Sequence, residues 1–200
     1  MQREPMSKQH AFSLILASAS ARRRELLAQA GYKFTAISPD IDESAFSTTG
    51  ITADEYAKEL ALAKAKNVAE KYPDSLVIGA DTVVDYHGQI IGKPADAEEA
   101  EQITRKLFSA PHKVITAVAL VRLSDRTELC ESDTTTVYPK SLTDEQIARH
   151  IKSGSWQDKA GAYAIQENGD EFIQKIDGSL TNVMGLPMEL LQRLLERFDD

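Results

Sequence analysis

The sequence predicts a protein of the α/β class. Apolar, β-branched segments suited to strands alternate along the chain with segments of helical periodicity. The length of 200 residues fits one domain. No repeat, low-complexity tract or long linker divides the chain. We therefore expect one domain over residues 13–200 after an extension over residues 1–12, while the pattern leaves open whether its sheet forms one layer or two lobes.

Two helices are expected in the first half of the chain. Ser20 is a suitable N-cap for a helix from Ala21 to Ala30, and Gly31 ends it. A longer helix starts at Thr52, where T-A-D-E supplies an N-cap and a glutamate three residues later. Short apolar or β-rich segments predict strands at Leu14–Ala17, Phe34–Ser38, Leu76–Val84 and Ile90–Ile91, the last one after a turn at Tyr86–Gly88.

Three helices are expected in the second half. The segments D-A-E-E and T-D-E-Q cap helices that start at Asp96 and Thr143, and the first of these ends near Phe108. Pro187 suits the first turn of a C-terminal amphipathic helix. β-Branched segments predict strands at Lys113–Leu123, Thr134–Tyr138 and, late in the chain, Glu171–Ile176.

Composition and charge exclude several classes of protein. Hydrophobic residues make up 42% and charged residues 27% of the chain, which excludes a disordered or fibrous protein. The formal net charge of −8 argues against nucleic-acid binding, so a polyanionic ligand would need a local cluster of cations. Cys130 is the one cysteine, which excludes an internal disulfide and a cysteine-based zinc site. Because the apolar runs are short and no signal peptide is visible, we expect a cytoplasmic protein without a membrane partner.

The segment S-A-S-A-R-R-R, from Ser18 to Arg24, is the first candidate binding site. The N-cap at Ser20 places Arg22 and Arg23 in the first helical turn, where cations oppose the helix dipole. Arginines at a strand-to-helix junction of an acidic protein suggest an anion site, to which the free N–H groups of the helix start would add. Solvated surface arginines are the alternative.

Lys64 is the second candidate, because it interrupts an apolar helical stripe. An inward-facing lysine needs an anionic partner, either a carboxylate or a bound phosphate. A lysine that snorkels out from the edge of the core is an equally good interpretation. The stripe consists of Ala57, Leu60, Ala61 and Val68.

Acidic residues at two places could carry chemistry. Asp81 interrupts the apolar strand L-V-I-G-A-D-T-V-V, which suits a general base or metal ligand at a strand end, with a turn-forming aspartate as the alternative. Asp42 and Glu43 follow a strand in I-D-E-S, and their carboxylates are ligands of the kind that Mg²⁺ or Mn²⁺ prefers. Acids in loops are more often simply solvated.

Polar residues in two loops complete the candidates. Lys93 lies beside a glycine in G-K-P, where its ammonium group could meet a phosphate. The segment D-K-A-G-A-Y-A-I-Q adds Lys159 and Gln166, and the amide of Gln166 could read a base edge.

Other site types are excluded by their missing motifs. The chain has no G-x-x-x-x-G-K-[ST] loop, no G-x-G-x-x-G after a strand and no G-x-S-x-G elbow. The histidines have no metal-ligand spacing, so we expect surface or structural roles for His10, His87, His112 and His150.

These segments together resemble the Maf family of septum-formation-inhibitor-like nucleotide pyrophosphatases. The matching segments run in order over nearly the whole chain: L-I-L-A-S-A-S-A-R-R-R-E-L-L, I-D-E-S, L-A-L-A-K-A-K, I-G-A-D-T-V-V, I-G-K-P, T-A-V-A-L, D-K-A-G-A-Y-A-I-Q and G-L-P. The resemblance implies a fold like that of inosine triphosphate pyrophosphatase, with a mixed twisted sheet, flanking helices and two lobes around a cleft. It also implies a homodimer and metal-dependent hydrolysis of a nucleoside triphosphate to the monophosphate and pyrophosphate.

The resemblance also implies roles for individual residues. The family's catalytic aspartate falls on Asp81, with Glu43 and Asp81 as the expected ligands of Mg²⁺ or Mn²⁺. Arg22, Thr82 and Gln166 occupy the positions that divide the family by substrate and resemble the branch acting on dTTP and UTP, where the 7-methyl-GTP branch tends to carry Trp, Gln and Glu. The one departure is Ala21, where proline is usual. The remaining positions expected to bind substrate are Ser18, Arg23, Lys64, Lys93 and, from its motif alone, Lys159.

Two other functions fit the same cleft. A nucleotide-binding regulator of cell division would bind without much hydrolysis, and a phosphatase would act on other small phosphates. Asp81 and Glu43 beside the cations favour an enzyme, because a protein that only binds needs no acid facing the phosphates.

Overall fold

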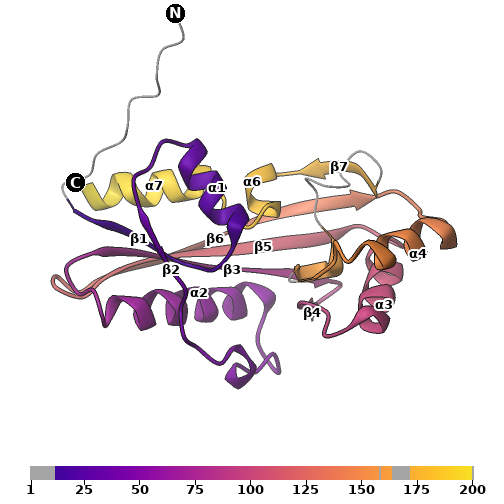
Figure 1. Cartoon of the computed structure of the whole chain (residues 1–200), viewed down its shortest axis with the longest axis horizontal. Helices are drawn as coiled ribbons and strands as arrows, with labels where there is room; N and C mark the ends of the chain where they lie inside the picture. The colour runs from indigo at the N-terminus through magenta and orange to yellow at the C-terminus, as the bar shows by residue number, and fades with distance from the viewer. Residues whose placement is uncertain (1–11, 158, 164–171, 200) are drawn as a thin grey trace, which may run out of the picture.

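A seven-stranded mixed sheet forms the centre of the computed structural model, which describes residues 12–157, 159–163 and 172–199 (Figure 1). This architecture confirms the expected α/β class. The strands are β1 (Leu14–Ala17), β2 (Thr35–Ile37), β3 (Leu76–Tyr86), β4 (Gln89–Ile91), β5 (His112–Arg122), β6 (Thr127–Pro139) and β7 (Ile173–Asp177). The helices are α1 (Ala21–Gln29), α2 (Ala53–Ala69), α3 (Ala97–Leu107), α4 (Asp144–Ser153), α6 (Leu180–Val183) and α7 (Met188–Asp199), with 3₁₀ turns η1 (Glu43–Ala45) and η2 (Ala160–Ala162).

The strand order leaves a gap along one edge of β3. The order is β2-β1-β3-β5-β6-β7, and β4 also pairs with β3. β5 occupies one edge of β3 over residues 77–85. On the other edge, β1 pairs with residues 76–79 and β4 with residues 84–86. Residues 80–83 of β3 therefore have no strand partner on this edge among the strands that the structure describes.

The helices begin where the predicted caps place them. The side chain of Ser20 accepts a hydrogen bond from the backbone N–H of Arg23, and that of Asp96 accepts one from Glu99. Thr52 and Thr143 each form a reciprocal capping box with the residue three positions later. Each such cap stabilises its helix by about 1 kcal/mol, so these helix starts are fixed locally by the sequence.

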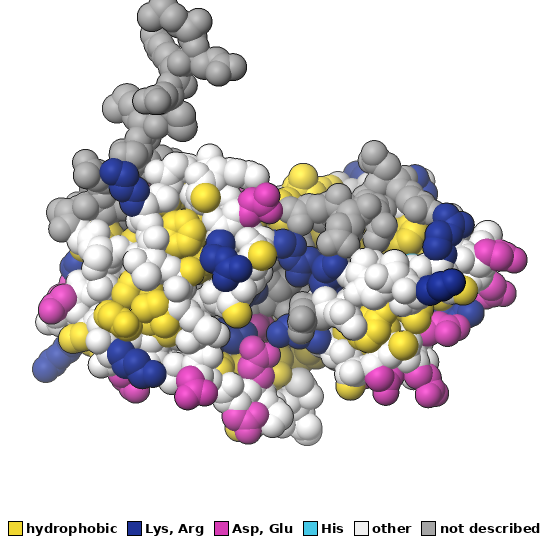
Figure 2. Space-filling model, viewed as in Figure 1, with side chains coloured by type: hydrophobic (Ala, Val, Ile, Leu, Met, Phe, Trp, Pro, Cys, Tyr) yellow, Lys and Arg dark blue, Asp and Glu magenta, His cyan; other side chains and the backbone are white. Residues whose placement is uncertain are grey.

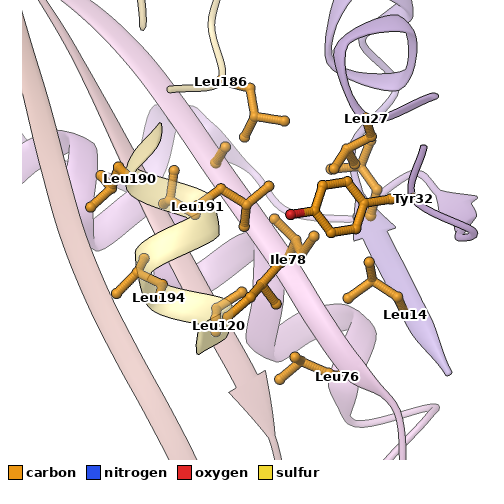
Figure 3. Packing of buried hydrophobic residues seen from close by; sticks show 14 of the residues in the cluster. Leu14, Leu27, Tyr32, Leu76, Ile78, Leu120, Leu186, Leu190, Leu191 and Leu194 are labelled. Carbon is orange, nitrogen blue, oxygen red and sulfur yellow. The ribbon is translucent and has the colours of Figure 1, made fainter. Parts of the chain in front are cut away.

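The two faces of the sheet are covered by different helices (Figure 1). Leu27 of α1 and Leu191 of α7 pack with Ile78 and Leu120 of the strands on one face (Figure 3). On the other face, α2 lies directly against β3. A Cβ atom on Gly79 would lie 2.2 Å from the backbone oxygen of Ala61, so only glycine permits this approach. The close contact fixes the distance between α2 and β3 near the site described below.

A third apolar cluster lies around α3, α4 and η2, and two buried histidines support it. His112 Nε2 lies 2.9 Å from the hydroxyl of Tyr163, and His150 Nε2 donates to the carbonyl of Ala162 at 2.7 Å. Burial lowers the pKa of His112. The expected structural role is confirmed for these two histidines, while His87 lies in the turn after β3 and His10 lies outside the described residues.

The structure differs from the predicted elements in four places. The strand expected at Thr134–Tyr138 is wrong in length, because β6 already starts at Thr127 and pairs with β5 along the whole of that strand. Its first half is polar and half-exposed, which hides it from an apolar pattern. The short helix α6 and the 3₁₀ turns η1 and η2 were not predicted, since none of the three is long enough to show a period. No helix within the described ranges is long and apolar enough to cross a bilayer.

Candidate functional site

A pocket of about 570 Å³ opens at the gap beside β3. Lysine and arginine side chains gather around the hollow between the two halves of the face in Figure 2. The pocket brings together the residues that the resemblance and its motifs assign to the site, as far as they are described. Asp42 does not line the pocket, and Gln166 lies outside the described residues. Its lining includes Ser18, Arg22, Arg23, Glu43, Lys64, Asp81, Thr82, Lys93 and Lys159.

Asp81 does not lie at a strand end, contrary to the sequence-based expectation. It is in the middle of β3, which continues to Tyr86. The neighbouring strand β1 is the one that ends, because its last residue, Ala17, pairs with Gly79. Asp81 is therefore reached through the gap left by β1, so the position of the site depends on the length of a different strand.

Lys64 joins two acidic residues at the centre of the pocket. Its Nζ lies 2.6 Å from Oδ1 of Asp81 and 2.7 Å from Oε1 of Glu43. The side chains of Lys64 and Asp81 are 7% and 9% exposed, whereas that of Glu43 is 42% exposed. Of the two interpretations of Lys64, the structure supports the inward-facing one with an anionic partner. Its partners in this structure are carboxylates, and the contact of α2 with Gly79 brings Lys64 within reach of Asp81.

The two carboxyl groups have pKa shifts in opposite directions. Burial raises the pKa of Asp81, and the nearby charges of Lys64 and Arg23 offset this only in part. Partial burial would also raise the pKa of Glu43, but its hydrogen bond and ion pair with Lys64 and the charge of Lys93 outweigh that effect and lower it. A carboxyl group with a raised pKa is a better base than an ordinary aspartate, so Asp81 suits proton transfer.

Glu43 reaches the pocket from η1. Asp42 caps this turn by accepting hydrogen bonds from the N–H and the hydroxyl of Ser44. Lys93 Nζ lies 3.8 Å from Oε2 of Glu43, and its side chain is about half exposed. Asp42 thus has a structural role, while Glu43 and Lys93 face each other across the pocket mouth.

Arg23 binds the backbone at the gap in the sheet. Its Nε donates to the carbonyl of Gly185 at 2.7 Å, and its Nη1 donates to the carbonyl of Ala80 at 2.8 Å and to Ser18 Oγ at 3.5 Å. Its Nη2 donates to Thr82 Oγ1 at 3.1 Å. Desolvation lowers the pKa of Arg23, against the opposing charge of Asp81. The guanidinium therefore occupies the place of a missing strand partner, a role that the arginine pattern did not indicate.

Sequence reasoning missed Thr116, Asn182 and Gly185. Thr116 lies opposite Thr82 in the register of β3 and β5, with 2.9 Å between their hydroxyl oxygens. Asn182 is fully buried in α6, and Gly185 supplies the carbonyl that binds Arg23. Thr116 and Gly185 stand in two segments quoted for the family resemblance, T-A-V-A-L and G-L-P, but neither residue was singled out there, and Asn182 lies outside those segments.

The donor set of the pocket fits a hard divalent cation. Mg²⁺ in phosphate-transfer sites is usually held by one or two carboxylates together with substrate phosphates and water. Glu43 and Asp81 supply two carboxylates that converge on one cationic group, the Lys64 ammonium. No group of three or more His, Cys, Asp or Glu residues suited to a metal occurs among the described residues. The remaining ligands would therefore have to come from substrate and water.

Comparisons with known proteins identify the family and the fold of the chain. A relative from Alkaliphilus oremlandii, named dTTP/UTP pyrophosphatase, is 45% identical over 94% of this chain and 96% of its own. A second, from Geotalea uraniireducens and with the same name, is 44% identical over 88% of this chain and 90% of its own. The solved Ham1 protein of Staphylococcus aureus has a TM-score of 0.53 at 17% identity, covers 92% of this chain and 98% of its own, and confirms the expected fold. The model of the Maf-like protein family matches residues 13–198, and the chain therefore belongs to that family.

Proposed function

We propose that this protein is a nucleoside triphosphate pyrophosphatase that hydrolyses dTTP and UTP to the monophosphate and pyrophosphate. The observation that carries the proposal is the buried Asp81–Lys64 pair, with Glu43 beside it, in a pocket lined by further cations. The curated relatives with 44–45% identity are named for the same reaction.

Asp81 is the proposed general base. Hydrolysis between the α- and β-phosphates needs a water molecule that is oriented and deprotonated on the side opposite the leaving pyrophosphate. Asp81 offers a carboxylate with a raised pKa, held in place by Lys64 at 2.6 Å. It therefore suits both tasks, and general-base catalysis typically contributes about 10²–10⁴-fold in rate.

The cations of the pocket are the proposed holders of the triphosphate. Lys64 and Lys93 lie on the Asp81 and Glu43 side, where they would balance the phosphate charge in an otherwise acidic protein. Glu43 and Asp81 would hold a divalent cation, which when bound would neutralise the charge that develops on the phosphates. Arg23 contributes mainly by holding the pocket wall, because most of its N–H groups already bind protein acceptors.

Base selection is proposed to fall on Arg22, Thr82 and Gln166. Arg22 and Thr82 line the same pocket, and the names of the relatives specify dTTP and UTP. A site built to pair with a keto and N3–H edge leaves groups unpaired when a 4-amino base enters, which can be worth about 10²-fold in kcat/KM.

Pyrophosphate release from a panel of triphosphates tests the proposal. We expect kcat/KM for dTTP and UTP to exceed that for CTP, dGTP and 7-methyl-GTP, and turnover to require added Mg²⁺ or Mn²⁺. Binding of dTTP without turnover would support the alternative of a nucleotide-binding regulator. Release of inorganic phosphate from unrelated phosphate esters would support a phosphatase.

A further inference from the structure

A chain of hydrogen bonds runs from the pocket into the sheet and ends at a buried carbonyl. Arg23 Nη2 lies 3.1 Å from Thr82 Oγ1, which lies 2.9 Å from Thr116 Oγ1. Thr116 Oγ1 in turn lies 2.9 Å from the backbone oxygen of Asn182. The chain connects β3, β5 and α6 on the face of the sheet opposite Lys64.

The chemistry of its two ends fixes the direction of every proton in the chain. A guanidinium group can only donate and a carbonyl can only accept, while a hydroxyl has one proton and two lone pairs. Thr116 must therefore donate its proton to the carbonyl of Asn182. The bond between the two threonines must then be donated by Thr82, which receives its own hydrogen bond from Arg23.

The Thr82 hydroxyl consequently has no proton left for a ligand. One of its lone pairs accepts from Arg23, and the other has no partner among the residues that the structure describes. Thr82 is half-buried and lines the pocket. A ligand group that meets it has to be a hydrogen-bond donor.

Asn182 holds the far end of the chain in place. Its Nδ2 donates to the carbonyl of Val114 and to Thr135 Oγ1, each at 2.9 Å, so both of its N–H groups are used. Its Oδ1 is buried without a partner among the described residues, which is unfavourable. The two donated bonds nevertheless tie α6 to β5 and β6 and so fix the backbone oxygen of Asn182 that accepts from Thr116. The same turn also supplies the carbonyl of Gly185 to Arg23.

We propose that Thr116 and Asn182 are positioning residues that hold Thr82 as an obligate acceptor toward the pocket. This wall then selects a ligand group that carries a proton, such as the imide N3–H of uracil or thymine. At N3, where uracil and thymine donate a proton, cytosine presents a lone pair, and phosphate oxygens present only lone pairs, so neither supplies a donor to Thr82 from that position. The inference rests on the proposed function and adds the origin of its selectivity.

Thr116→Val tests the proposal, because valine keeps the shape and removes the hydroxyl. Without Thr116 as its acceptor, Thr82 can turn its proton toward the ligand and tolerate cytosine. We expect the ratio of kcat/KM for UTP to that for CTP to fall on the order of tenfold. Thr116→Ser should retain the ratio. Thr104→Val is the matched control, since it removes a fully buried hydroxyl that only bonds to Ala100 within α3.

Binding measurements separate this inference from the proposed function. The α,β-methylene analogues of UTP and CTP cannot be cleaved between those phosphates, so calorimetry gives their affinities whether or not the protein is an active enzyme. We expect the wild type to prefer the UTP analogue and Thr116→Val to narrow the preference. The Thr116→Val substitution could narrow the preference for the UTP analogue although the wild type hydrolyses no triphosphate. That result would overturn the proposed function and leave the inference standing.

Two results would overturn the inference. One is a wild type that does not distinguish UTP from CTP, and the other is a Thr116→Val variant that keeps the wild-type ratio. If Thr116→Val fails to fold, Thr82→Val replaces it, because removing the acceptor from the pocket wall should also abolish the preference. A preserved ratio in that variant would contradict the proposal equally.

Discussion

At the scale of single residues, the site depends on one buried ion pair with a third charge beside it. Lys64 and Asp81 are both almost fully buried, and Glu43 shares the same ammonium group from the pocket mouth. Breaking a buried pair costs more than breaking an exposed one, because the remaining charge has no water to solvate it. Substitutions at Lys64 and Asp81 should therefore affect both pH dependence and rate.

Asp81→Asn is expected to keep the fold and lose most of the turnover. Asparagine has nearly the same shape but cannot accept a proton from water, so kcat should fall by about 10²–10⁴. Asp85→Asn is a matched control in the same strand, since its side chain only accepts from the N–H of Gly88 in the following turn. If kcat of purified Asp81→Asn stays within a few-fold of the wild type, Asp81 is not the base.

Lys64→Met should shift the pH dependence of both activity and stability. The Lys64 charge lowers the pKa of Asp81, so its removal raises that pKa further and moves the rising limb of kcat/KM to higher pH. At pH values between the ordinary pKa of an aspartate and the raised pKa of Asp81, the folded variant holds a proton on Asp81 that the unfolded chain has lost. The free energy of unfolding of the variant therefore decreases as pH rises through that window.

The loss of stability in Lys64→Met should be about 3 kcal/mol near neutral pH and smaller in acid. Lys66→Met is the control, because Lys66 forms an exposed ion pair with Glu128 and should change stability little. Denaturant titrations at several pH values measure the free energy of unfolding of each variant and of the wild type. Equal losses at acid and neutral pH would show that the lysine acts through packing alone.

At the scale of elements, the contact between α2 and β3 sets the geometry of the site. Gly79 lets the backbone of α2 approach β3. Asp81, two residues after Gly79 in β3, then lies within ion-pair distance of Lys64 from α2. The end of β1 at Ala17 opens the edge beside them. Packing of the helix and termination of the strand therefore place the two charged residues together.

Gly79→Ala should push α2 away from β3. The new Cβ atom would lie 2.2 Å from the carbonyl oxygen of Ala61, which belongs to the helix backbone and cannot rotate away. We expect a loss of about 1–3 kcal/mol in unfolding free energy, together with reduced kcat. Gly92→Ala is the stability control, since its Cβ would meet nothing within 4 Å. Equal stability of both variants would contradict the close contact.

At the scale of the whole molecule, the sequence predicted the class, most helix starts and most of the pocket. Caps such as Thr52 and Thr143 act over three residues, so local sequence suffices to find them. Helical periodicity placed Lys64 on the apolar stripe of its helix but did not decide between an inward and a snorkelling side chain. By contrast, the bonds of Arg23 to Gly185 and Ala80 join residues far apart in the chain, and only the strand order brings them together. The polar half of β6 is a strand because β5 pairs with it.

The products formed from UTP test the central claim most directly. The claim is that the pocket at the gap in β3 directs water to the bond between the α- and β-phosphates. Separation of the reaction products by ion-exchange chromatography should show UMP and pyrophosphate in equal amounts from the first turnovers, and their formation should stop in Asp81→Asn. Formation of UDP and inorganic phosphate, or product formation that continues unchanged in Asp81→Asn, would contradict the claim.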